Sequence, residues 1–395
     1  MGEAWGVEVL QAIAKIVLQP LFYWSLILVF YAGYRRIKKE RKQFGIKVND
    51  LFSEWSSTWI LSIGFGLIIT AIMLGVGVVF TYETMLVLSI STILLSIHGK
   101  LTWLSASYTV GLTYIVVLFA PILLAYQDVI PVHSFDNVNL TSIALLASLL
   151  LIAEGILLRM MHGNESFASI GKSTRGARIG EHSLSKLSII PFFVLIPSGL
   201  ITPIADFWPT ISIGAENYSL LLFPFILGFN HVVRSSLPQE GARYIGKWIG
   251  LLGTLILAIV IGSIYVPFLS ALAILVAIIG REFILYKFRS REKQSLPFFT
   301  ERKDGIMVLT VIPGSRADRL GIVVGETIVK VNGKNIQSVS DFYYFLQESN
   351  GFFKLDVLDK YGEVRFIQSA LYEGDHHELG IIFIEEREPY TEAYE

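Results

Sequence analysis

The sequence predicts a polytopic α-helical membrane domain followed by a small soluble α/β domain, and two observations lead to this fold class. Of the 395 residues, 53% are hydrophobic and only 16% are charged, and the mean hydropathy is +0.58. These values are too apolar for a soluble globular protein. The charged residues are sparse up to about residue 280 and dense after it. We therefore expect a transmembrane domain over 1–280, a basic juxtamembrane helix or linker over 281–294, a soluble domain over 295–388 and a short tail over 389–395.

Apolar segments recur along the membrane half. Each is long enough, or nearly long enough, to cross a hydrocarbon core of about 30 Å, so eight or nine transmembrane helices are expected. Pro121, Pro191 and Pro224 indicate that some of them are kinked, tilted or re-entrant. The segments lie near residues 17–34, 59–81, 84–97, 105–126, 141–158, 187–205, 219–233, 248–265 and 267–284.

The N-terminal residues 4–17 are amphipathic. We expect them either to lie flat in the membrane interface or to extend the first apolar segment. No small-residue cleavage site follows that segment, so the N-terminus is expected to be retained as an anchor. The absence of cysteine excludes disulfides, thiolate metal sites and cysteine nucleophiles.

The distribution of basic residues predicts which side of the membrane each loop occupies, because Lys and Arg in short loops stay in the cytoplasm. Six basic residues lie within 35–42. Alternate crossings from there place the loops around Lys100, Lys186, Arg243 and Arg281 on the same side. This predicts a cytoplasmic C-terminal domain and, if the first segment crosses, an external N-terminus. The intervening loops contain the acidic residues Glu83, Asp128, Asp136, Asp206 and Glu216.

The same basic residues have a second interpretation. A basic run beside a membrane attracts anionic lipid, at roughly 1 kcal/mol for each Lys or Arg close to the surface. A topology signal alone is the simpler interpretation, and lipid attraction stays open beside it.

The membrane half contains no recognisable catalytic motif. A zinc protease on membrane helices needs two His one turn apart with a Glu beside them, and no H-E-x-x-H occurs. Ser198-Gly199 resembles a serine nucleophile, but no His lies at a plausible depth in a later segment. We therefore predict no enzyme activity, no metal and no cofactor. The alternatives are a protease with an unfamiliar site and a transporter or secretion component, although no internal repeat supports transport.

Two features of the apolar segments favour structural roles. Glu154 is the most conspicuous ionisable residue within such a segment, where a buried carboxylate is a candidate functional group. Its place near the end of the segment predicts snorkelling or an ion pair with Arg159. Gly246 and Gly250 form a small-xxx-small step, which predicts close helix packing within the bundle or between protomers.

The periodicity changes after residue 281 to an alternation typical of strands. A first short helix is expected over 316–320, and a second, capped by Ser340, over 341–348. The sequence thus predicts a five- to six-stranded, partly open barrel with two helices. The expected strands cover 305–312, 326–331, 353–358, 363–371 and 379–385.

Three motifs in this region resemble PDZ domains of the type found on bacterial trypsin-like periplasmic proteases. They are VIPGSRADRLGI (311–322), VGETIVKVNG (324–333) and SDFYYFL (340–346). The resemblance covers residues 295–386. It implies that an extended peptide adds as a strand beside a helix, and that backbone amides of a Gly-containing loop hold its terminal carboxylate.

Two segments resemble that carboxylate-binding loop. Glu378-Leu379-Gly380-Ile381 has the expected pattern but follows the other motifs, which indicates a circular permutation. The rival, 295–299, is in the usual place, but its Pro297 removes an amide donor. We favour Leu379, Gly380 and Ile381.

The second predicted helix supplies the side chains that a bound peptide would meet. These are Asp341, Tyr344 and Phe345. Phe342 and Leu346, four residues apart, are expected to face the core, and Phe345 stays open between the two roles. His376 and His377 are expected to form a solvated turn rather than a ligand site.

A multi-span membrane region followed by one PDZ domain, without a protease motif, resembles the MinJ family of cell-division topology factors from Gram-positive rods. The segments QPLFYW (19–24) and RRIKKERKQF (35–44) and the total length also fit that family. The resemblance implies a non-enzymatic membrane adaptor at the division septum and cell poles. It further implies protein partners, namely the scaffold DivIVA, the ATPase MinD of the MinCD inhibitor and other divisome members. Nucleic acid is not expected as a partner, and homo-oligomerisation is left open.

Overall fold

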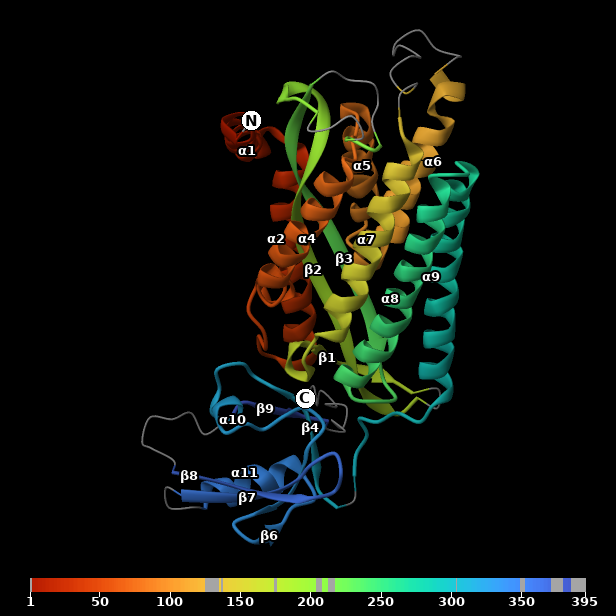
Figure 1. The fold of residues 1–395 in the computed structure, drawn as a ribbon. Coiled ribbons are helices and arrows are strands. Elements are labelled where there is room, and N and C mark those ends of the chain that lie inside the picture. The colour runs from red at the N-terminus through yellow and green to blue at the C-terminus, as the bar shows by residue number, and fades with distance from the viewer. Residues whose placement is uncertain are drawn as a thin grey trace, which may run out of the picture.

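The chain forms a long bundle of helices with a small mixed domain at one end, as the computed structural model shows (Figure 1). The structure describes residues 2–124, 135, 138–173, 176–203, 208–211, 217–302, 304–348, 352–370 and 379–384. Several residues named above lie outside these ranges: Asp128, Asp136, Asp206, Glu216, His376, His377, Glu378 and the tail 389–395.

The bundle contains fewer membrane-spanning helices than the sequence predicts. Within the described residues, five helices are long and apolar enough to cross, or six if the bent N-terminal pair counts as one span. The pair bends by 58°, so the amphipathic helix α1 does not simply extend the first span. α5 has only 15 residues. The helices are α1 (Gly2–Lys15), α2 (Pro20–Phe44), the short α3 (Ser53–Ser56), α4 (Trp59–Val76), α5 (Tyr82–Ser96), α6 (Ala106–Leu124), α7 (Leu140–Arg159), α8 (Pro238–Ser263) and α9 (Phe268–Gln294).

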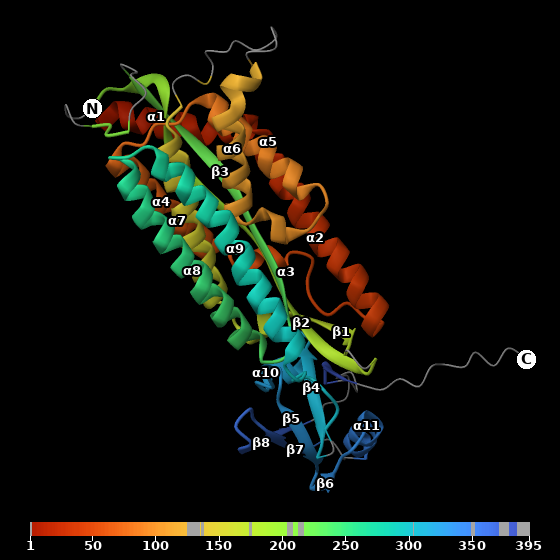
Figure 2. The ribbon, with the colours of Figure 1, turned by 90° about the vertical axis from the view of Figure 1, so that its right-hand side faces the viewer.

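The predicted helices over 187–205 and 219–233 are wrong, because both segments are strands. β2 (Arg178–Ile201) and β3 (Tyr218–Val233) pair antiparallel and run the length of the bundle (Figures 1 and 2). The short β1 (Phe167–Lys172) joins β2 at the base. Pro191 and Pro224 face each other in the register. Each would break a helix, whereas a strand accepts a proline whose nitrogen lies at an unpaired edge.

Side chains from neighbouring segments supply hydrogen-bond partners to some backbone groups along the edges of this β2–β3 ribbon. A strand edge inside an apolar bundle must find partners for its backbone groups, since hydrocarbon offers none. The Thr70 hydroxyl of α4 accepts from the Phe193 amide at 2.9 Å. The Gln19 side-chain amide donates to the Leu222 carbonyl at 2.6 Å. The bundle therefore encloses the ribbon as an internal layer.

Glycines allow the closest approaches within the bundle. A Cβ on Gly66 of α4 would lie 1.9 Å from the Pro191 carbonyl oxygen of β2. A Cβ on Gly155 of α7 would lie 2.5 Å from the Gly250 nitrogen of α8, and one on Gly246 would lie 2.7 Å from the Gly155 oxygen. The small-xxx-small step therefore packs α8 on α7 within one chain.

Glu154 is fully buried on α7, and its partner differs from the prediction. Its carboxylate lies 2.6 Å from the Arg281 guanidinium, and both side chains are 0% exposed. The Ser105 hydroxyl donates to the other carboxylate oxygen at 2.7 Å. Neither snorkelling nor a pair with Arg159 occurs, because α9 continues past residue 280 and carries Arg281 into the bundle. The proposed boundary at residue 280 thus falls inside a helix.

In its described residues, the C-terminal domain contains six strands and two helices, where five to six strands and two helices were predicted. Its sheet runs in the order β8-β7-β5-β4-β9, and β6 pairs with β5. The second helix begins at Val339 and is capped by Ser338, not by Ser340 as predicted. The elements are β4 (Ile306–Val311), α10 (Arg316–Arg319), β5 (Thr327–Val331), β6 (Lys334–Asn335), α11 (Val339–Gln347), β7 (Phe352–Leu358), β8 (Val364–Ala370) and β9 (Ile381–Phe383).

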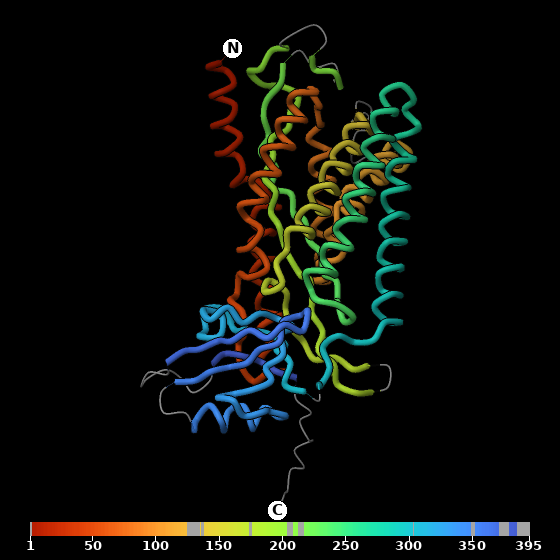
Figure 3. The backbone as a smooth tube through the Cα atoms, turned by 60° about the horizontal axis from the view of Figure 1, so that its bottom comes forward, coloured from red at the N-terminus to blue at the C-terminus, as the bar shows by residue number. Residues whose placement is uncertain are grey.

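This domain is docked against the end of the bundle where α2, β1 and β2 meet (Figure 3). Two backbone hydrogen bonds cross the junction, from the Gly180 amide to the Phe299 carbonyl at 2.9 Å and from the Phe298 amide to the Arg234 carbonyl at 2.8 Å. An apolar cluster surrounds them. Its buried members are Ala168 from β1 together with Phe299, Met307, Leu309, Val324 and Ile384.

Candidate functional site

Among the described strands, β9 is paired on one edge only, and its other edge and the neighbouring helix α11 border the candidate peptide site. β9 is the last strand in the sheet order and pairs with β4 on one side. On the other side, the Phe383 ring of β9 packs edge-on against the Phe342 ring of α11, with centroids 5.2 Å apart. A cavity of about 270 Å³ lies at the N-terminal end of α11, between Ser338 and Ile384. An open strand edge beside a helix is the arrangement that strand addition requires.

The backbone of the predicted carboxylate loop has a defined orientation. The Leu379 carbonyl accepts from the Ala317 amide at 3.0 Å, and the Gly380 carbonyl accepts from the Ile312 amide at 2.8 Å. In a trans peptide the next N–H points opposite to the C=O. The amides of Gly380 and Ile381 therefore point away from α10 and β4. Two successive amides with a shared direction form a concavity suited to an anion.

Gly380 is required by this backbone. Its φ is +80°, in the left-handed region, and a Cβ there would lie 2.4 Å from the Ser315 Cβ. The flanking side chains of Leu379 and Ile381 are only 1% and 5% exposed and belong to the domain core. These three residues can thus offer backbone amides to a ligand, while two of their side chains fix the loop.

The structure gives Asp341 a role that the sequence did not suggest. The Asp341 carboxylate accepts from the Gln337 and Ser338 amides at 3.2 and 3.0 Å. In return, the Asp341 backbone amide donates to the Ser338 hydroxyl. These hydrogen bonds, first of all the one from Gln337, lower the pKa of Asp341. The carboxylate therefore caps α11 and remains charged.

The two aromatic residues predicted to contact a peptide lie on different faces of α11. Phe345 is one turn after Phe342, on the face that meets β9, and is half-buried. The Lys334 ammonium lies 4.8 Å from its ring centroid. Tyr344 is 64% exposed and faces away from Phe342. Peptide contact by either residue stays a prediction.

The rival segment, 295–299, lies at the junction with the bundle. Phe299 is fully buried, and its ring centroid is 4.6 Å from that of His182 on β2. Its carbonyl accepts from Gly180, and Phe298 donates to Arg234. This segment is thus engaged in docking the C-terminal domain.

Known proteins match part of the C-terminal domain and the whole chain. The family described as PDZ domain matches residues 307–352, which include all but the first residue of β4 and the whole of α10, β5, β6 and α11. Over 390 residues, 98% of this chain and 97% of the relative, the sequence is 31% identical to the "Cell division topological determinant MinJ" of Bacillus subtilis (strain 168). The chain belongs to the MinJ family.

Two further MinJ-family relatives extend the match. Each is named "Probable cell division topological determinant MinJ", from Lacticaseibacillus paracasei and from Lacticaseibacillus casei (strain BD-II). Each is 20% identical over 383 residues, which cover 95% of this chain and 98% of the relative. The C-terminal domain of this MinJ-family chain is accordingly a PDZ domain, and the relatives are named as determinants of division topology rather than as enzymes.

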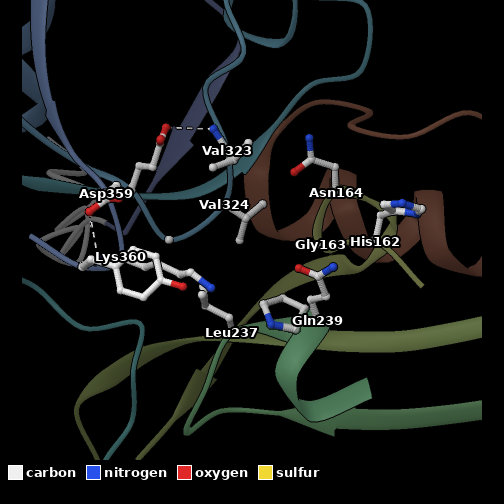
Figure 4. A pocket seen from close by; sticks show the side chains of 13 residues that line it. His162, Gly163, Asn164, Leu237, Gln239, Val323, Val324, Asp359 and Lys360 are labelled. Carbon is white, nitrogen blue, oxygen red and sulfur yellow. Dashed lines mark hydrogen bonds between the residues drawn. The ribbon is translucent and has the colours of Figure 1, made fainter. Parts of the chain in front are cut away.

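A second cavity, of about 440 Å³, separates part of the PDZ domain from the bundle (Figure 4). His162 and Gln239 line it from the bundle, and Asp359 and Lys360 line it from the PDZ domain. Lys360 lies 3.8 Å from the Glu240 carboxylate across the gap. The sequence did not predict the contact between the PDZ domain and the bundle, which also includes His182 and Gly180 beside Phe299. The residues that form this contact are far apart in the chain.

Proposed function

We propose that this protein is a non-enzymatic membrane adaptor in division-site selection, and that its PDZ domain captures an extended segment of a partner protein. The observation that carries this proposal is the outward direction of the Gly380 and Ile381 amides beside the open edge of β9. The names of the full-length relatives support the placement of that capture in cell division.

We further propose that the PDZ domain is cytoplasmic. The basic residues at the end of α2, among them Arg41 and Lys42, lie at the end of the bundle that carries the PDZ domain (Figure 2). Arg243 and Lys247, near the start of α8, lie at the same end. Glu83, at the start of α5, lies at the opposite end (Figure 1). This distribution supports the orientation that basic loops predict.

The order of the strands supports a circularly permuted PDZ domain. The candidate carboxylate loop and β9 come last in the chain but lie beside β4, the first strand of the domain. The groove would then consist of the 379–381 loop, β9 and α11. Its contacts would be the amides of Gly380 and Ile381 and the ring of Phe345, with Tyr344 at the rim.

The partners that fit this role are the scaffold DivIVA and the ATPase MinD, at the septum and cell poles. One of them would use the groove and the other a separate surface. A single PDZ groove binds weakly, but confinement of the partners to one membrane raises their effective concentration. The adaptor therefore needs no high intrinsic affinity.

Recruitment of MinD to the septum in dividing cells tests this proposal. We expect removal of residues 296–395 to abolish recruitment while the membrane domain still inserts, and Gly380→Val in the full chain to weaken it. Normal recruitment by the truncated chain would contradict the proposal. So would cleavage of a partner by the purified membrane domain, since that would make the protein a protease.

A further inference from the structure

A hollow of about 280 Å³ opens at the base of the bundle. It lies between α2, the 3-10 turn η2 (Leu101–Leu104) and the sheet formed by β1, β2 and β3. It is separate from the peptide groove, because no residue of β9 or α11 lines it.

Besides Arg36, which lies in the wall, three basic side chains surround this hollow. Arg35 and Lys39 come from successive turns of α2, and Lys100 comes from the turn before η2. All three are exposed. The Arg35 guanidinium donates to the Gly99 carbonyl at 3.2 Å, which holds it beside Lys100. Within the described residues, none of the three forms an ion pair with an acidic side chain.

The two acidic residues that line the hollow share one cationic partner within its wall, the Arg36 guanidinium. Glu40 lies 2.8 Å from the Arg36 guanidinium, and Glu54 lies 2.7 Å from it. Glu40 also accepts from the amides of Val48 and Asn49. Four basic side chains against two carboxylates leave the lining of the hollow with a net positive charge, which favours an external anion.

The back wall is polar but uncharged. Ser183 and Ser185 of β2 and Asn230 of β3 line it, and the Ser183 hydroxyl donates to the Asn230 side-chain oxygen at 2.8 Å. Hydroxyl and amide groups behind a cationic mouth suit a phosphate ester that carries hydroxyl groups.

The position of the hollow identifies the source of that phosphate. Ser185 lies two residues before Leu187, where the apolar part of β2 begins. On α2, the turns before Arg35 expose Ile27 and Phe30, as expected of a surface that faces lipid. The hollow therefore lies where lipid headgroups meet the protein.

We propose that this hollow binds the headgroup of an anionic phospholipid. Arg35, Lys39 and Lys100 hold the phosphate, and the acyl chains lie along the Ile27 and Phe30 face of α2. The site provides a fixed lipid contact beside the docked PDZ domain and does not depend on the proposed peptide groove.

Native mass spectrometry of the purified full chain, after reconstitution with phosphatidylglycerol or with phosphatidylcholine, tests this proposal. The test variant is Lys39→Gln with Lys100→Gln. The matched control is Lys38→Gln with Lys42→Gln, which removes two charges at exposed positions of α2 that do not line the hollow. We expect retention of phosphatidylglycerol to fall roughly tenfold in the test variant and to stay unchanged in the control, with phosphatidylcholine retained weakly by all three proteins.

An equal loss in both double variants would overturn the proposal, because it would mean diffuse attraction to a basic surface. Displacement of phosphatidylglycerol by inorganic phosphate would also overturn it, since the site would then serve a soluble anion. The thermal unfolding temperature of each variant identifies a folding defect. If the test variant is destabilised, Arg35→Gln with Lys100→Gln replaces it and must give the same selective loss.

Discussion

The guanidinium of Arg281 lies 2.6 Å from the carboxylate of Glu154, and neither side chain is exposed. This ion pair joins α9, which continues toward the PDZ domain, to α7 in the centre of the bundle. A buried charge without its partner is strongly unfavourable, so each residue depends on the other.

Removal of either partner is expected to destabilise the bundle. Glu154→Ala or Arg281→Ala should lower the free energy of unfolding by about 3–5 kcal/mol, because each leaves an uncompensated buried charge. Glu154→Leu combined with Arg281→Met should cost less than either single change. Denaturant unfolding in detergent measures these differences. As a control, breaking the exposed pair of Glu240 and Lys360 should leave the unfolding of the bundle unchanged. Neutral single variants at 154 and 281 would contradict the buried pair.

Two glycines of α4 test whether 187–205 is a strand packed on that helix. Gly66→Ala places a methyl group 1.9 Å from the Pro191 carbonyl, whereas Gly64 has no atom within 4 Å of the corresponding position. We expect Gly66→Ala to destabilise the protein by about 1–3 kcal/mol. Gly64→Ala should be neutral or slightly stabilising, because alanine favours helix. Equal thermal unfolding temperatures for the two variants would mean that β2 does not pack here.

Substitution of two glycines of the PDZ domain distinguishes the effect of a steric clash in the carboxylate loop from the effect of backbone strain alone. Gly380 and Gly333 have φ values of +80° and +81°, but only Gly380 has a close neighbour, Ser315. Alanine at either position costs about 1–2 kcal/mol for its left-handed backbone. We expect Gly380→Ala in the full chain to abolish binding of a labelled C-terminal peptide from a partner, measured by fluorescence polarisation. Gly333→Ala should bind normally, and comparable binding by both variants would move the groove elsewhere.

His182 makes docking of the PDZ domain sensitive to pH. It lies at the base of β2, outside the apolar part of that strand, with its Nδ1 atom 2.8 Å from the Ser166 hydroxyl and Phe299 against its ring. Burial lowers the pKa of His182 to about 3 from its ordinary value near 6.5. The docked state thus holds neutral histidine, and docking is fully stable above about pH 6.5 and weakens as the pH falls below it, by at most about 1.4 kcal/mol per pH unit.

Proteolysis of the 295–299 segment at different pH values measures this effect. Cleavage should increase between neutral pH and about pH 5 in the unmodified protein, and the increase should be smaller in His182→Phe, which cannot gain a proton. Cleavage that is independent of pH in both proteins would mean that His182 is not buried at the junction.

The absence of native cysteine allows a direct test of orientation. Single cysteines at Glu83 and at the exposed Ser340 can be treated with a membrane-impermeant maleimide in intact cells. We expect labelling of Glu83→Cys in intact cells, and of Ser340→Cys only after permeabilisation. The opposite pattern would place the PDZ domain outside the cytoplasm.

The sequence located the apolar segments better than it assigned their structure. All nine contain a helix or strand of the bundle, but 187–205 and 219–233 are strands. A continuous apolar run fits a buried strand as well as a helix. Pro191 and Pro224 indicated a departure from regular helix, and their pairing across a ribbon could not be seen without the register.

The PDZ domain was easier to predict, because its strands alternate and its turns contain Asn-Gly and Pro-Gly pairs with local causes. Tertiary relationships were not predictable in the same way. Arg281 pairs with Glu154 only because α9 and α7 pack together. The directions of the Gly380 and Ile381 amides follow from the Leu379 and Gly380 carbonyls, which accept from Ala317 and Ile312. No local sequence pattern records these long-range contacts.

The cellular position of the fluorescently labelled full chain tests the central claim most directly. In dividing cells, an adaptor of division-site selection accumulates at the septum and the poles, and the Gly380→Val variant fails to support normal placement of the septum. Uniform staining of the cell membrane by the unmodified protein would contradict the account.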